Sequence, residues 1–439
     1  METTRRQALL SGLFGAGAVG LRALATGLPA WLLASPLAAR ATPGVCQGAD
    51  LNAAQYLILV TSEDGDPLNA NVPGTYDFPD IYHSSDPRMA PTPMTLGTGR
   101  TTAARPWATL DPATLARTCF FHHGTYTINH GNHPKVLRLM GAVRRQEMLI
   151  SLLARNLAPC LGTIQLEPAV ISPNLITYQG RVLPILSPPD LSSLLSGPST
   201  PLANLQRLRD NDMDRLNALF KKHGTMAQRA LLDEHGQSQA QARSLSSLLL
   251  DNLSGIKGSS RNDLNITAAV LIRMNVAPVV TMSYSWGGDN HSDSGLATET
   301  TETLASVAAI ANLMTRLREF GLQDRVTFVA QNVFGRTLSR KVRSDANGRD
   351  HHGNHHCSVM IGSRFRSSMI GGLELKGIEY EGQAISSQSG QGGAGGDIAF
   401  ADTLGAMGKT LGAAVGVNQS ILDVEITQGK VVKAALNVG

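Results

Sequence analysis

The residues best suited to chemistry in this 439-residue chain are its histidines, which cluster rather than scatter. Four of the twelve fall within six residues of one stretch, GRDHHGNHHCSVMIG, Gly348–Gly362, with Asp350 before them and Cys357 after them. Imidazole and carboxylate groups together suit divalent metals such as zinc, and manganese where oxygen ligands are more numerous. Taken alone, this histidine-rich stretch is equally consistent with a solvated polar loop, so the choice depends on its surroundings.

Three further polar clusters accompany it along the chain. One is Glu63–Asp66, another spans His122–His133 and holds four histidines, and the third is WGGDNHSD, Trp286–Asp293. Asp289 and His291 are two residues apart on a segment that leaves a strand, and an irregular loop would let both turn toward one ion. We therefore interpret the clusters together as a candidate metal site.

The elements that must position these clusters alternate between strands and helices. Short apolar runs predict strands at 55–61, 279–285, 325–330 and 357–361, and helical spacing or composition predicts helices at 134–158, 204–222, 226–253, 265–274, 298–320 and 402–415. Residues 70–118 and 168–201 are predicted to be irregular. This order predicts an α/β fold with a mostly parallel sheet flanked by helices, and ligands at the carboxyl ends of its strands.

The first 41 residues are predicted to be an export signal rather than part of the fold. Thr4–Leu9, TRRQAL, is similar to a twin-arginine signal, an apolar Gly/Ala-rich run follows, and Ala39–Ala41 is a candidate cleavage site. The alternative is an uncleaved N-terminal anchor, which Arg22 inside the apolar run disfavours. We expect the twin-arginine machinery to export the protein to the periplasm or beyond, with residues 42–439 as a single domain carrying a helical insertion near 200–255.

Charge and cysteine content narrow the functional classes. The chain has 38 basic and 34 acidic residues, of which four arginines and one glutamate belong to the signal, so the remainder is almost neutral. A neutral body argues against nucleic acid and against a polybasic membrane patch, and no second apolar run is long enough to span a bilayer. The four cysteines, Cys46, Cys119, Cys160 and Cys357, allow three full pairings in an oxidising compartment, and spacing does not choose among them.

The run from about 265 to 377 resembles an exported bacterial family, domain of unknown function 1501, of the alkaline-phosphatase-like, sulfatase-like group. The matching elements, in chain order, are Trp286–His291 after a strand, Asp324–Val329 with Phe334–Thr337, Gly348–His351, and Ile370–Gly372 after a further strand. Upstream, Gly65–Asn69 resembles a family element that follows the first strand, and the twin-arginine start is also usual there.

The resemblance implies an alkaline-phosphatase-like sandwich that binds one or two divalent ions, zinc or manganese, and hydrolyses small anionic phosphate or sulfate esters. Carried onto this sequence, it places metal ligands at Asp66, Asp289, His291, Asp350 and His351. His133, His352 and Arg336 are possible additional site residues, and Arg336 could grip an anion or form a structural salt bridge.

Two departures from the family pattern leave a second reading open. Asn332-Val333 stands where the family has Ser-Glu, and Asn132-His133-Pro134 is the nearest match to a family Ser-His-Phe element. A carboxylate and a serine nucleophile would both be missing. The alternatives are therefore a metal-dependent ester hydrolase and a non-catalytic metal-binding or assembly protein of the cell envelope on the same fold.

Overall fold

A computed structural model describes residues 46–195, 252–342 and 348–437, with scattered residues between 215 and 229. Two compact units are distinguished, one of residues 43–185 and 260–439 and the other of residues 1–42 and 186–259. The described part of the second unit includes helix α8 (Pro188–Leu195). The predicted signal and the predicted helices at 204–222 and 226–253 lie largely outside the described residues. Among the residues that are described, no helix has both the length and the apolar character to cross a membrane.

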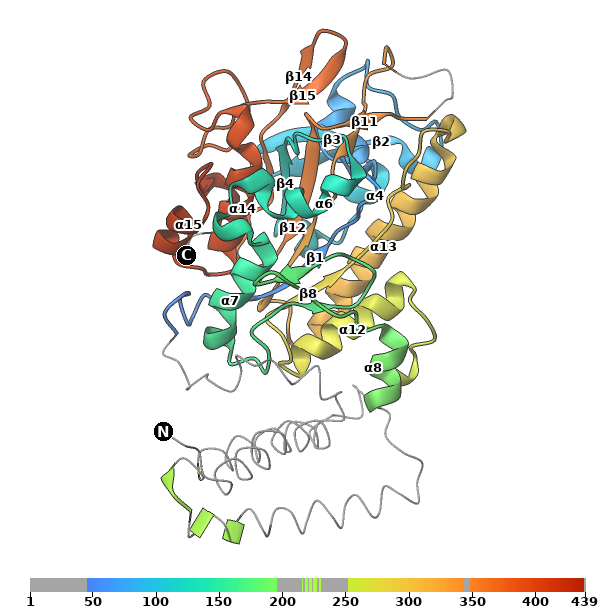
Figure 1. Cartoon of the computed structure of the whole chain (residues 1–439). Coiled ribbons are helices and arrows are strands. Elements are labelled where there is room, and N and C mark those ends of the chain that lie inside the picture. Colours follow the sequence, from blue (N-terminus) through green and yellow to red (C-terminus); the bar gives the residue numbers. More distant parts are fainter. Residues whose placement is uncertain are drawn as a thin grey trace. The chain divides into compact units, whose positions relative to one another are not determined.

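A seven-stranded sheet forms the centre of the first unit, in the order β13-β4-β12-β9-β1-β8-β5 (Figure 1). Its strands are β1 (Tyr56–Val60), β4 (Thr118–His123), β5 (Ala169–Val170), β8 (Val279–Met282), β9 (Val326–Ala330), β12 (His356–Ile361) and β13 (Ser368–Ile370). The prediction of an α/β fold flanked by helices is confirmed. The prediction of a mostly parallel sheet is wrong, because β12 runs antiparallel to both β4 and β9 and makes the sheet mixed. Periodicity reports which residues are buried but not strand direction, so the sequence could not reveal this reversal.

The remaining elements are short hairpins and helices. The hairpins pair β2 (Pro91–Leu96) with β3 (Gly99–Ala104), β6 (Thr177–Tyr178) with β7 (Arg181–Val182), β10 (Gly335–Arg336) with β11 (His351–His352), and β14 (Leu373–Lys376) with β15 (Glu379–Gly382). The helices are α3 (Leu68–Asn71), α4 (Arg105–Ala108), α5 (Pro112–Leu115), α6 (His133–Leu137), α7 (Leu149–Leu161), α12 (Arg261–Arg273), α13 (Ala297–Glu319), α14 (Thr403–Ala414) and α15 (Gln419–Glu425).

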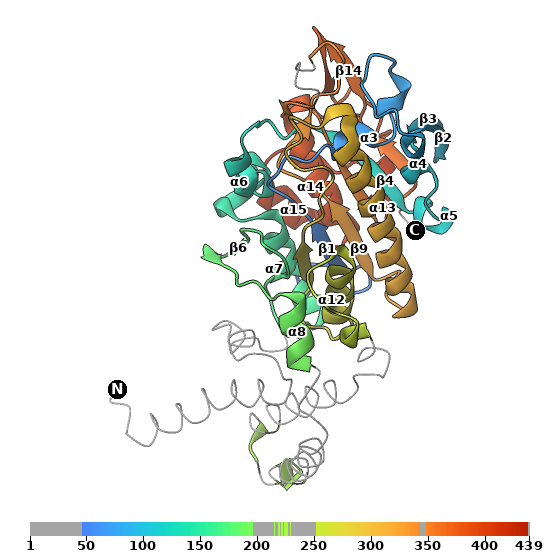
Figure 2. The same cartoon turned by 90° about the vertical axis from the view of Figure 1, so that its right-hand side faces the viewer.

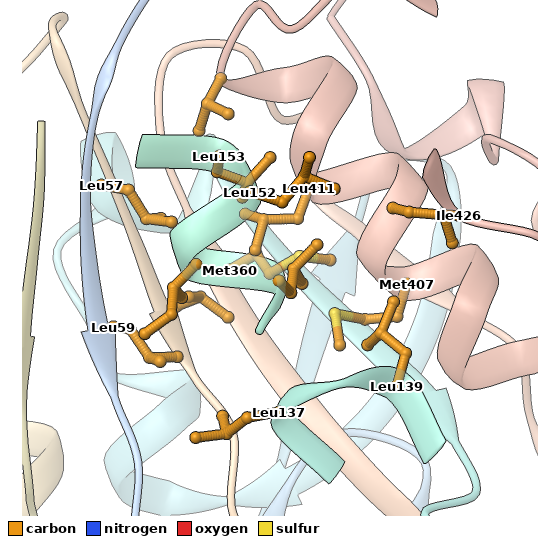
Figure 3. Close-up of a cluster of buried hydrophobic side chains, with 14 of the residues drawn as sticks. Leu57, Leu59, Leu137, Leu139, Leu152, Leu153, Met360, Met407, Leu411 and Ile426 are labelled. Atoms are coloured by element: carbon orange, nitrogen blue, oxygen red, sulfur yellow. The ribbon is translucent and has the colours of Figure 1, made fainter. Parts of the chain in front are cut away.

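Helices cover both faces of this sheet, which is why its central strands β1, β8, β9 and β12 are buried along their whole length. Figure 1 shows α12 and α13 on one side and α7 and α14 on the other, and Figure 2 shows α12 and α13 in front of β1 and β9. Figure 3 shows the core beneath α7 and α14, where Leu57 and Leu59 of β1 lie on the side of Leu152 of α7, and Met407 of α14 lies beside Leu139 in the same cluster. The sheet is therefore held rigidly from both sides, and its strand ends can position polar loops.

The predicted helix at 134–158 is two helices instead of one. α6 ends at Leu137, and α7 begins only at Leu149. Between them Met140, Gly141 and Arg145 have positive φ angles of 54°, 96° and 60°, which a continuous right-handed helix excludes. The apolar spacing that predicted one helix reflects burial of both halves against the same core. Both segments predicted to be irregular contain regular elements: β2 and β3 lie within 70–118, and β5, β6, β7 and α8 lie within 168–201.

The structure contains one disulfide among the four cysteines. Cys46 and Cys160 form a disulfide that closes a 114-residue separation, whereas Cys119 and Cys357 are buried free thiols. Replacing Cys46 and Cys160 together by serine is expected to lower the free energy of unfolding by about 2–4 kcal/mol, because the bond restricts a long loop in the unfolded chain. Urea denaturation without reductant measures this loss. Dithiothreitol should lower the free energy of unfolding of the unmodified protein by the same amount and should not change that of the double variant. If dithiothreitol does not change the stability of the unmodified protein, the prediction is wrong.

Candidate metal centre

The polar clusters meet at one edge of the sheet because of its strand directions. β1, β4, β8 and β9 all end at this edge, and β12 begins there since it runs the opposite way. The segments that leave the first four strands and the segment that enters β12 are therefore neighbours. The first part of the histidine-rich stretch, residues 348–355, lies directly before β12, which brings it to the loops that carry Asp289 and His130.

Three imidazole rings and one carboxylate converge here, and we call His130, Asp289, His291 and His351 the histidine–aspartate cluster. The Nε2 atom of His351 is 2.9 Å from that of His291 and 3.2 Å from that of His130. Asp289 Oδ1 is 3.1 Å from His291 Nε2 and 3.2 Å from His351 Nε2, and Asp289 Oδ2 is 3.6 Å from His130 Nε2. Ligand atoms of His130, Asp289 and His351 therefore all lie within 4.8 Å of one another, and His291 Nε2 adjoins two members of this group, His351 and Asp289.

The other nitrogen of each ring is held by a group that can only accept a hydrogen. His130 Nδ1 is 2.6 Å from the Glu63 carbonyl, and His351 Nδ1 is 2.7 Å from the Ile128 carbonyl. His291 Nδ1 is 3.1 Å from Asp350 Oδ1. Each Nδ1 must therefore carry the hydrogen, which leaves a lone pair on each Nε2 of the neutral rings.

Three facing lone pairs beside a carboxylate repel one another unless a metal cation or a proton lies between them. The arrangement matches the chemistry of a zinc-type site, in which each imidazole binds through one nitrogen and donates from the other to a carbonyl or carboxylate. About half of the Asp289 side chain and two-fifths of the His291 side chain remain exposed. The residues present therefore fit a divalent ion in a site that is open to solvent on one side.

Arg336 contacts Asp289 from the protein interior and does not face the solvent-exposed side of the cluster. Its side chain is completely buried and donates 2.6 Å to Asp289 Oδ1, 2.8 Å to the Asp64 carbonyl, and to the Gly65 carbonyl. Partial burial of Asp289 opposes ionisation, but the hydrogen bond and charge of Arg336 lower the pKa of this carboxyl below its ordinary value. The structural role outlined for Arg336 accounts for these contacts better than capture of an external anion.

Asp66 lies beneath the loop that carries Asp289 and is directed at the backbone. Its Oδ1 accepts hydrogen bonds from the Trp286 amide at 2.6 Å and the Gly288 amide at 2.9 Å, and burial raises its pKa. The loop turns at Gly287, whose φ of 129° is rarely adopted by other residues. The structure thus brings Asp289, His291, Asp350 and His351 together, and it gives Asp66 hydrogen bonds to the loop that supports them.

The two further predicted histidines are bonded elsewhere. His133 Nε2 lies 2.7 Å from Thr61 Oγ1, and burial lowers the pKa of His133 to about 4. His352 Nε2 lies 2.8 Å from the Tyr380 carbonyl, beyond the β10–β11 hairpin. Neither ring makes a described contact with the histidine–aspartate cluster.

The second half of the histidine-rich stretch belongs to a different group, which we call the buried histidine quartet. It comprises His122 and His123 of β4 with His355 and His356, at the start of β12, stacked or edge-on in two pairs. All four side chains are buried, and burial lowers the pKa of His122 and of His123 to about 4 and places those of His355 and His356 well below the ordinary value of 6.5. These rings are therefore neutral and structural.

Acid lability is expected from the buried histidines. His123 takes up a proton near pH 6.5 when unfolded but only near pH 4 when folded, so stability present above pH 6.5 is lost as the pH falls toward 4. His123→Gln should reduce the pH dependence of the unfolding free energy over this window by about 1 kcal/mol per pH unit. Urea titrations at several pH values measure that slope. Ser358→Ala, which removes the hydroxyl 2.9 Å from His123 Nε2 but keeps the ring, should lower stability without changing the slope; equal slopes in all three proteins would contradict the prediction.

The departure at Asn332-Val333 has a clear structural counterpart. Val333 is fully buried in the apolar core. The backbone N–H of Asn332 donates a 3.0 Å hydrogen bond to His356 Nε2 of the quartet. The next residue, Phe334, packs its ring against His351 and His130, with centroids 4.6 Å and 4.9 Å away. Where the family pattern has a carboxylate, this chain therefore has a buried valine, and the rings of the cluster are supported by the phenylalanine that follows it.

No sequence pattern singles out His130 as a ligand within the His122–His133 cluster. The resemblance to the family points instead to His133, which matches a family element. The carbonyls of Glu63 and Ile128, which orient two of the rings, carry no sequence signal because every residue has one. His130 could have been favoured only by knowing that residues 124–132 leave the end of β4 toward the cluster.

Comparison with known proteins identifies a family that matches part of the chain. A model of the family described as Protein of unknown function (DUF1501) matches residues 203–376. The matched range includes Asp289, His291, Asp350 and His351, whereas His130 lies outside it. No match was found among curated proteins.

Proposed function

We propose that this chain, which resembles the DUF1501 family, is an exported metal-dependent hydrolase of small anionic phosphate or sulfate esters. The observation that carries the proposal is the convergence of three imidazole lone pairs and the Asp289 carboxylate at one open site. The helix-flanked sheet with this site at its strand ends supports the proposed relation to the alkaline-phosphatase-like group. The ester substrate rests on that relation.

The chain's own residues supply binding and orientation. His130, His291 and His351 would hold zinc or manganese with Asp289, while Asp350, Glu63 and Ile128 keep the rings aligned through Nδ1. A bound divalent ion would polarise an ester oxygen and lower the pKa of a water molecule. Arg336 keeps Asp289 ionised from the buried side, which leaves the exposed side for substrate and water.

A non-catalytic metal-binding protein is the second candidate, and one observation favours it. Within the described ranges, no serine or threonine hydroxyl hydrogen-bonds to a side chain of the histidine–aspartate cluster. A covalent route through such a nucleophile therefore lacks support, and the hydrolase proposal depends on direct attack by water. Without such attack, the same site would bind metal for assembly or recognition in the cell envelope.

Metal analysis followed by an ester assay tests the proposal. The purified protein should contain about one equivalent of zinc or manganese by mass spectrometry, and p-nitrophenyl phosphate or sulfate should be hydrolysed only by the metal-loaded form. Metal without hydrolysis of either ester would favour the second candidate, and no metal after folding in metal-replete medium would contradict both. Export is tested separately by fractionation with Arg5→Lys/Arg6→Lys as the control; the disulfide between Cys46 and Cys160 supports an oxidising compartment.

A further inference from the structure

A cavity of about 800 Å³ lies away from the histidine–aspartate cluster, and none of the four cluster residues lines it. Its walls are the turn between β2 and β3, the edge strand β13, and the loop segments around 383 and 389–392. We propose that this cavity binds a small organic anion with an apolar body. Its volume is that of ordinary small-molecule sites, roughly 300–1,000 Å³.

The charge of the cavity wall selects an anion. Arg100 and Arg366 both line it, and neither has a carboxylate within ion-pair distance among the described residues. The carboxylate that lines the cavity, Asp77, is already engaged, since its oxygens accept from Thr101 Oγ1 at 2.7 Å and from the Thr102 amide at 2.9 Å. The two guanidinium groups are therefore free to pair with an incoming carboxylate, sulfonate or phosphate.

The rest of the wall suits an apolar body attached to that anionic group. Phe78 and Met369 line the same cavity, and both side chains are partly exposed. Burying such surface is favourable by about 25 cal/mol per Å², whereas a free inorganic anion would leave it in water. An amphipathic organic anion uses both kinds of wall.

His122 of the buried histidine quartet lies behind this wall, and its neighbours determine its tautomer. The backbone N–H of Arg336 donates to Asn69 Oδ1 at 2.8 Å, which fixes the orientation of the Asn69 side-chain amide. Asn69 Nδ2 therefore faces His355 Nδ1 at 3.1 Å and donates a hydrogen bond to it. His355 Nε2 must then donate across 2.9 Å to His122 Nδ1, which leaves the hydrogen of His122 on Nε2.

That Nε2 atom is shielded from solvent, and the backbone of Pro73 interacts with the ring. His122 therefore supports the wall from behind, and the two guanidinium groups are what favours an anion.

Fluorescence titration with 8-anilinonaphthalene-1-sulfonate, an aromatic organic anion, tests the proposal on the full chain. Arg100→Gln/Arg366→Gln should weaken binding about tenfold or more, because two charge-assisted contacts are lost. Arg144→Gln/Arg145→Gln is the matched control, since both arginines are exposed and lie outside the cavity wall. Decanoate should displace the probe at concentrations at which decanol does not.

A blocking variant separates this cavity from other apolar surfaces. Thr98 is an exposed turn residue in the cavity wall, so Thr98→Trp should fill the entrance and abolish binding while the near-ultraviolet circular dichroism of the fold is retained. Equal probe affinity in the two arginine pairs, displacement by decanol as effective as by decanoate, or full binding by Thr98→Trp would each overturn the proposal. None of these results bears on the metal centre, whose test is metal content.

Discussion

Replacing His351 by alanine is expected to weaken zinc binding by about 100-fold or more. Its Nε2 atom is the shared neighbour of His130, His291 and Asp289, at 3.2, 2.9 and 3.2 Å, so its removal opens the centre of the cluster. Loss of a residue that merely orients a ligand commonly costs 10–100-fold in metal affinity, and loss of the ligand itself costs at least that much. Competition with a zinc-binding dye measures the change.

The same loss should appear as lost thermal protection. A ligand present at 100 times its dissociation constant stabilises a folded protein by about 2.7 kcal/mol, and chelation with EDTA removes this contribution. The melting temperature of the unmodified protein should therefore fall on chelation, and that of His351→Ala should not. His352→Ala is the matched control, because the adjacent ring is bonded to the Tyr380 carbonyl and not to the cluster. Zinc affinity that is equal in His351→Ala and His352→Ala would show that no ion binds here.

The sequence predicted part of this centre because local patterns report local chemistry. Asp289 and His291 follow a strand on a short polar loop, and Asp350 and His351 precede another, so the rule that ligands gather at strand ends placed them together. His130 was not selected because its proximity depends on β4 lying next to β12. The pairing of β4 with β12 joins residues that are far apart in the sequence. The local sequence of His122–His133 gives no sign of it.

The direction of β12 explains why the histidine-rich stretch divides in two. Because β12 begins at the strand-end edge where its neighbours finish, His351 lies at the open surface, whereas His355 and His356 enter the sheet beside His123 and His122. Residue type alone cannot distinguish a metal-binding histidine from a buried structural one, since both are simply histidines in the sequence. Burial decides between them, and burial here follows from the antiparallel pairing that sequence periodicity did not reveal.

The loops that carry the ligands are joined by a buried ion pair, and this gives the second large effect. Arg349 directly precedes Asp350 and His351, and its Nε donates 2.8 Å to Glu299 Oε2 in the first turn of α13. Asn290, between Asp289 and His291, donates 3.0 Å to the same oxygen. Glu299 therefore fixes both ligand segments at once, and both charges are almost completely shielded from water.

Arg349→Ala is expected to lower the free energy of unfolding by about 3–5 kcal/mol, because it leaves the Glu299 carboxylate buried without its partner. Arg318→Ala, which breaks a half-exposed pair with Asp111, should cost less than about 1 kcal/mol in the same urea titration. Glu299→Gln/Arg349→Met removes both charges and should recover most of the stability, but it no longer ties the segment before Asp350 to α13. The double variant should therefore fold while binding zinc about tenfold or more weakly, since ligand alignment is lost. A double variant with restored stability and unchanged zinc affinity would contradict a positioning role for this pair and reduce it to a contribution to stability alone.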